Sequence, residues 1–70
     1  MKDLKDLYTI TYQITDKGKE YPPRTKEIPV KNRMVEDTLL KDLKKWRSAE
    51  GWSLKFEVKI ITFYQSGYSN

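Results

Sequence analysis

Basic side chains are the largest group of residues in this sequence that could take part in chemistry. The chain carries 14 Lys and Arg against 10 Asp and Glu, so its formal net charge is +4. Some of these cations fall on an expected helix, opposite its apolar stripe, and others on the expected last strand. Such cations can contact the phosphates of nucleic acids, whereas lysines late in a helix also simply complement its dipole. The candidate phosphate-binding residues are Arg33, Lys41, Lys44, Lys45, Lys55 and Lys59.

Catalytic and metal chemistry has few residues to draw on. The chain has neither cysteine nor histidine, which removes thiol nucleophiles, imidazole acid–base chemistry and nearly every zinc site. The carboxylates are scattered and show no calcium-loop spacing, and no glycine-rich phosphate loop occurs. We therefore expect no enzyme activity, no cofactor, no bound metal and no small-molecule substrate.

The segment over residues 53–64 gives the strongest indication of a contact surface. Its first half alternates apolar and charged residues, as a half-buried strand does, and the alternation breaks at Ile60-Ile61. If the strand is regular, Ile61 and Phe63 lie on the face away from the core and mark a contact site. Three alternatives compete with this interpretation. A bulge would return the two residues to the core, Leu4 and Leu7 near the N-terminus would fold over them, or one of the two residues would be accounted for in each way.

Two strands are expected before the helix. Residues 7–15 alternate isoleucine and tyrosine with threonine and glutamine, which predicts a strand with one buried face. Turn residues follow at Asp16-Lys17-Gly18-Lys19. The chain returns over residues 24–30, where Pro29 favours an edge strand because it cannot donate to the ladder.

A helix is expected over residues 33–49. Asn32 is a candidate N-cap, and Gly51 is suited to the left-handed residue that ends a helix, with Trp52 folding back behind it. The apolar residues recur at steps of four, four and three, which predicts one buried stripe. The stripe consists of Val35, Leu39, Leu43 and Trp46.

These elements predict an α+β domain with the order β-β-α-β. Its three-stranded antiparallel sheet would have the order 2-1-3, with the helix packed on one face. We expect a single domain over residues 1–70, with a flexible leader over residues 1–6 and a flexible tail over residues 65–70. Besides the helix stripe, the expected buried layer contains Tyr8, Ile10, Tyr12, Ile14, Ile28, Val30, Leu54, Phe56, Val58 and Ile60.

The leading functional hypothesis is a non-enzymatic accessory protein that binds another protein or a second copy of itself. The contact would use an exposed sheet edge together with Ile61, Phe63 and Lys59. The alternative is a nucleic-acid-binding module that uses the six basic residues. We expect no membrane association and a cytoplasmic location, and, by analogy with other small basic domains, a phage or mobile-element role.

Overall fold

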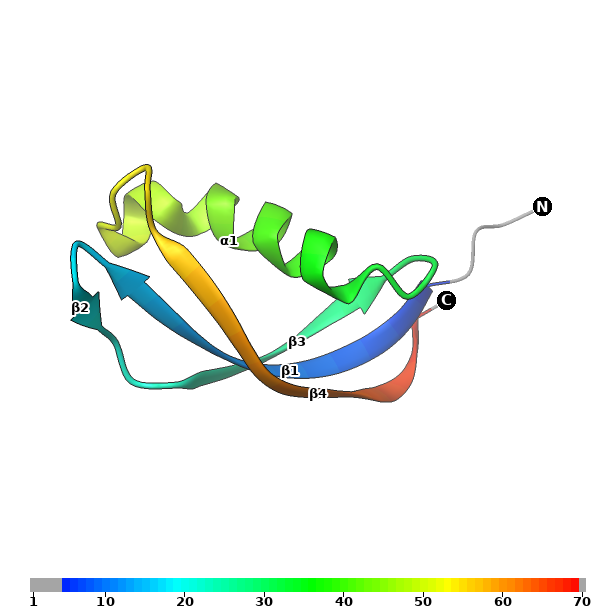
Figure 1. The fold of residues 1–70 in the computed structure, drawn as a ribbon. Coiled ribbons are helices and arrows are strands. Elements are labelled where there is room, and N and C mark those ends of the chain that lie inside the picture. Colours follow the sequence, from blue (N-terminus) through cyan, green and yellow to red (C-terminus); the bar gives the residue numbers. More distant parts are fainter. Residues whose placement is uncertain (1–4, 70) are drawn as a thin grey trace.

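A computed structural model describes residues 5–69 and contains four strands and one helix. In chain order the elements are β1 (Lys5–Asp16), β2 (Lys19–Glu20), β3 (Arg24–Val30), α1 (Val35–Glu50) and β4 (Glu57–Ser69). Figure 1 shows α1 lying across one face of the sheet. Below, the side of the sheet that carries α1 is the helix face, and the opposite side is the open face.

Strand β1 is the centre of an antiparallel sheet. It pairs with β3 and with the two-residue β2 along one edge, and with β4 along the other. The predicted α+β class and the strand order 2-1-3 are therefore confirmed, with β2 as an additional short strand. Lys17 and Gly18 both have positive φ, 54° and 78°, as the two central residues of a type I′ hairpin turn require.

The core lies between the helix face of the sheet and α1. Residues of β1 at alternate positions are buried there, as the period-two pattern predicted. Ile28 and Val30 of β3 are also buried, and Phe56, Val58 and Ile60 pack partly buried against the cluster. The buried apolar residues are Tyr8, Ile10, Tyr12, Ile14, Ile28, Val30, Val35, Leu39, Leu43 and Trp52.

The helix begins two residues later than expected and without the predicted cap. Asn32 and Arg33 both have positive φ, 55° and 58°, so Asn32 lies in a turn before α1. Met34 occupies the cap position, and no side chain caps the helix there. At the other end Gly51 has φ of 81° and donates its N–H to the carbonyls of Arg47 and Ser48. The Trp52 N–H also bonds to the Arg47 carbonyl at 3.1 Å, which confirms the expected ending with Trp52 folded back.

Two predicted core residues are exposed. Trp46 is 53% exposed, and Trp52, only 3% exposed, lies under the end of the helix instead. Leu54 is 82% exposed, because residues 53–56 form a turn in which the Phe56 N–H bonds to the Ser53 carbonyl. The last strand therefore begins at Glu57 rather than at Ser53.

Both ends of the described chain belong to the sheet. Lys5 pairs with Ser69 and Asp6 with Tyr68, so β1 and β4 extend into the segments that were expected to form a flexible leader and tail. The predicted strand end near Tyr64 is five residues short of the end observed at Ser69. Residues 1–4, including Leu4, lie outside the described residues.

Candidate protein-binding surface on strand β4

Strand β4 is a long edge of the sheet. It has 13 residues and, among the described strands, pairs only with β1. The opposite edge is interrupted by Pro22 and Pro23 between β2 and β3, and Pro29 lies within β3. Prolines and lysines are the residues that usually protect an edge from pairing with other chains. Strand β4 contains no proline, and Lys59 is its one basic residue.

A β-bulge explains the break in alternation at Ile60-Ile61. Ile60 pairs with Tyr12 and Thr62 pairs with Thr11, so Ile61 is an extra residue without a partner in β1. An extra residue in one strand shifts the register by one. Every side chain after it therefore lies on the opposite face from the one that it would have in a regular strand. A second bulge follows, because Gln65 pairs with Tyr8 and Gly67 with Leu7, which leaves Ser66 as the extra residue.

The bulge places Phe63 on the helix face, as the bulge alternative required. Phe63 pairs with the fully buried Ile10, and its ring lies 6.1 Å from that of Tyr8 between centroids. The interpretation that Phe63 lies on the open face is wrong for this reason. Tyr64, which pairs with Thr9, is the aromatic residue of β4 on the open face. Sequence reasoning missed Tyr64 because the register on which its position depends is set by the bulge.

Much of the apolar surface of β4 is exposed to solvent. Ile61 and Phe63 are each 49% exposed, and Tyr64 and Tyr68 are more exposed still. These residues lie within residues 61–68 of one strand, with Phe63 and Tyr68 on the helix face and Tyr64 on the open face. The predicted residues Ile61 and Phe63 are therefore exposed on the same strand as two tyrosines.

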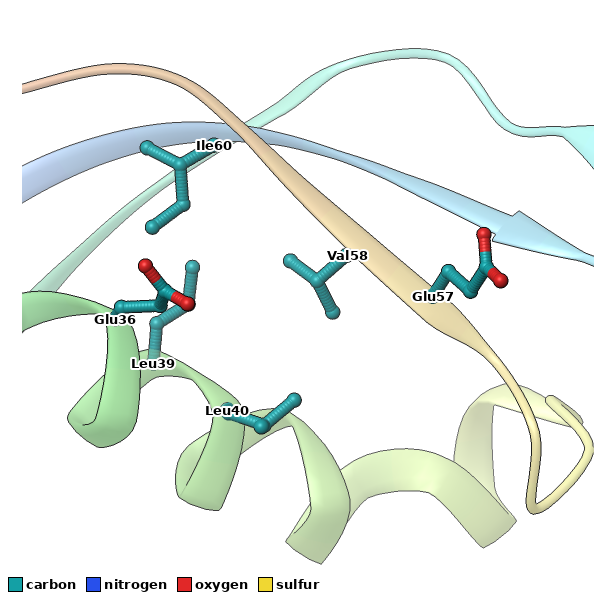
Figure 2. A pocket seen from close by; sticks show the side chains of 6 residues that line it. All are labelled: Glu36, Leu39, Leu40, Glu57, Val58 and Ile60. Carbon is teal, nitrogen blue, oxygen red and sulfur yellow. The ribbon is translucent and has the colours of Figure 1, made fainter.

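An apolar groove separates β4 from the helix. It has a volume of about 530 Å³ and is lined by Glu36, Leu39, Leu40, Glu57, Val58 and Ile60. Figure 2 shows Val58 and Ile60 directed from β4 toward the helix, and the Glu57 carboxylate turned away from them. A helix about 10 Å wide covers roughly two strands spaced about 4.8 Å apart. A single helix therefore leaves part of a three-stranded sheet uncovered, here along β4.

The open face is polar and rich in threonine. Its β1 residues alternate with the buried ones, and one of them, Thr11, pairs with Thr25 of β3 and Thr62 of β4. The hydroxyls of Thr11 and Thr25 are hydrogen-bonded at 3.2 Å. Lys59 also lies on this face, opposite Gln13.

The six candidate phosphate-binding residues are not gathered on one surface. Lys41, Lys44 and Lys45 are exposed on α1, whereas Lys59 pairs with Gln13 on the open face, across the sheet from α1. Arg33 lies in the turn before the helix, and Lys55 lies in the turn before β4. Two cations outside this set form ion pairs, Lys26 with Asp42 and Arg24 with Glu50.

Asp16 anchors the turn that precedes β4. Its carboxylate accepts hydrogen bonds from the Ser53 hydroxyl and from the Ser53 N–H, the latter at 2.9 Å. These bonds, the hydroxyl bond first, lower the pKa of the Asp16 carboxyl below its ordinary value of 3.8 because they stabilise the charged form. Asp16 therefore holds the turn that precedes β4 in place.

Neither a metal site nor a membrane-spanning helix is found in the described part of the chain. Within residues 5–69 no three acidic side chains lie close enough together to hold a metal ion. The helix of this part of the chain is not long and apolar enough to cross a membrane. In comparisons with known proteins, no family model, no curated protein and no solved structure matches this chain.

Proposed function

We propose that this chain is a non-enzymatic accessory protein that acts by binding a protein through the free edge of β4. The partner is another protein or a second copy of the chain. Main-chain groups along an open strand edge provide hydrogen bonds to an added strand, and alternate side chains provide selectivity. The carrying observation is that no other described strand pairs with the outer edge of the 13-residue β4, on which Ile61 and Phe63 stay half-exposed.

Nucleic-acid binding is less well supported by the arrangement of charge. A phosphate backbone is bound through a continuous basic surface, and the candidate cations lie on α1, in two turns and on the open face. In the protein-binding proposal, Lys59 lies on the binding strand itself, where it limits which partners can pair with β4.

The test compares two double variants in a pull-down from cells. Ile61→Ser/Phe63→Ser removes apolar side chains from β4, and Met34→Ser/Leu54→Ser is the matched control because those two residues are exposed and lie outside β4. We expect the first variant to lose partner capture or self-association at least tenfold, and the control to keep it. Far-ultraviolet circular dichroism establishes that both variants are folded.

Two results would contradict the proposal. Equal capture and equal oligomeric state in the folded Ile61→Ser/Phe63→Ser variant would show that β4 is not the contact surface. Capture that disappears after nuclease treatment of the lysate would instead support the nucleic-acid alternative.

A further inference from the structure

We propose that the partner of β4 is a second copy of the same chain, paired antiparallel edge to edge with the two-fold axis at Phe63. This inference rests on the proposed use of the β4 edge and adds the partner and the register. It follows from the order in which side chains alternate between the two faces of β4.

The two bulges make this order symmetric. Between them, Thr62 and Tyr64 pair with open-face residues of β1, and Phe63 and Gln65 pair with helix-face residues. Outside them the same alternation resumes in both directions. Toward the N-terminus of the strand, Lys59 is on the open face and Val58 on the helix face; toward its C-terminus, Gly67 and Tyr68 take the corresponding places.

An antiparallel dimer requires this kind of symmetry. When the two-fold axis is perpendicular to the sheet, residues that face each other across the new edge must lie on the same side. With the axis at Phe63, Thr62 faces Tyr64 of the second copy on the open face. Val58 faces Tyr68 of the second copy on the helix face. The bulge residue Ile61 then faces Gln65 of the second copy, and the bulge residue Ser66 faces Ile60. In every pair without a bulge residue, both residues lie on the same face of the sheet.

Other registers satisfy this condition less well. An axis at Ile61 would set Ile60 of the helix face against Thr62 of the open face. An axis at Tyr64 keeps the faces matched but leaves Glu57 and Val58 without partners. The register at Phe63 is the one that uses all 13 residues of β4.

Charge and side-chain size also favour the Phe63 register. Lys59 faces Gly67 of the second copy and Glu57 faces Ser69, so no like charges are opposed. The two Phe63 rings meet at the axis on the helix face, beside the groove between β4 and α1. Each copy would thereby bury part of the ring that is 49% exposed in the single chain. The dimer has one continuous sheet with its helices on the same face.

The chain provides a direct test because it contains no cysteine. A Phe63→Cys variant has a single thiol, and in the proposed register the two thiols of a dimer lie on facing residues. The Cα atoms of facing residues are about 4.5–5.5 Å apart, within the range that a disulfide spans. We expect Phe63→Cys to form a covalent dimer under mild oxidation at least tenfold faster than Leu54→Cys or Tyr64→Cys.

A second pair of variants keeps the contact between Phe63 and Tyr8 intact. Val58→Cys and Tyr68→Cys should cross-link when mixed, and each should cross-link far more slowly alone. The unmodified protein should show an increase from the 8.4 kDa monomer toward twice that mass in sedimentation equilibrium as its concentration rises.

The outcomes separate this inference from the proposed function. An unmodified protein that stays monomeric from about 1 μM to about 1 mM overturns the dimer, since that range spans weak to moderate affinities. Loss of partner capture in Ile61→Ser/Phe63→Ser would then still support binding of another protein. Faster cross-linking of Tyr64→Cys than of Phe63→Cys overturns the register. If capture and cross-linking are both absent, both proposals fail.

Discussion

Deletion of Ile61 tests the bulge on which the position of Phe63 depends. Removing one residue from the middle of a strand normally inverts every side chain beyond it. Here Ile61 is the extra residue, and its loss lets Thr62 follow Ile60 directly while each keeps its present partner in β1. We therefore expect the deletion variant to fold with the same register and without the bulge.

The expected energetic cost is small. Full burial of an isoleucine side chain contributes about 1.5–3 kcal/mol, and Ile61 is 49% exposed, so its deletion removes about 1 kcal/mol of stability. Had the strand been regular, Phe63 would lie on the open face and Thr62 on the helix face, and the deletion would exchange the two. Burial of the Phe63 ring and release of the threonine hydroxyl to solvent would then raise the free energy of unfolding instead of lowering it.

Urea denaturation followed by tryptophan fluorescence measures this difference, since Trp52 is buried in the core. Deletion of Thr11 is the control, because β1 pairs on both sides at that residue and the buried Ile10 and Tyr12 would be forced to opposite faces. We expect the control to be unfolded. A gain in stability or a loss above about 3 kcal/mol in the Ile61 deletion variant would refute the bulge, as would an unmodified protein without nuclear Overhauser effects between the Tyr8 and Phe63 rings.

Two further predictions concern the core and the turn before β4. Leu39→Ala should lower the free energy of unfolding by about 2–5 kcal/mol because Leu39 is 1% exposed. Leu54→Ala should change it by less than about 0.5 kcal/mol because Leu54 is on the surface. Equal effects of the two substitutions in urea denaturation would contradict the packing described. Asp16→Asn should reduce the pH dependence of stability. The folded-state pKa of Asp16 is lowered, so its stabilising contribution is present above pH 3.8 and is lost as pH falls through the lowered value. Denaturation of both proteins at about pH 6 and about pH 3 would show this, and an unchanged slope in the variant would contradict it.

Local patterns predicted the elements that pack along a single face. The alternation of β1 identified Tyr8, Ile10, Tyr12 and Ile14 as core residues, and all four are buried. Gly51 was recognisable as the helix ending because its conformation depends on its own backbone. Trp46 and Leu54 were misplaced, since both match a buried pattern in sequence. Their exposure results from Trp52 and from the turn held by Asp16, a residue far from Ser53 along the chain.

The candidate site was harder to predict than the core. The sequence indicated Ile61, Phe63 and Lys59 through the break in alternation, but it allowed both a regular strand and a bulge. Choosing between these requires the partner of each residue in β1, which is a tertiary contact between distant segments. The same contact extends β4 to Ser69, because the polar residues after Tyr64 are held by pairing with the start of β1 rather than by burial.

The element order, the fold class and the buried face of the central strand could be predicted from sequence because these follow from periodicity and from local turn chemistry. The tertiary structure decided which side of β4 each residue occupies. Two bulges, at Ile61 and Ser66, adjust the strand to β1 and restore its alternation. The physical reason is that a strand's faces are defined only relative to its neighbours, so a one-residue change in pairing reassigns every side chain beyond it.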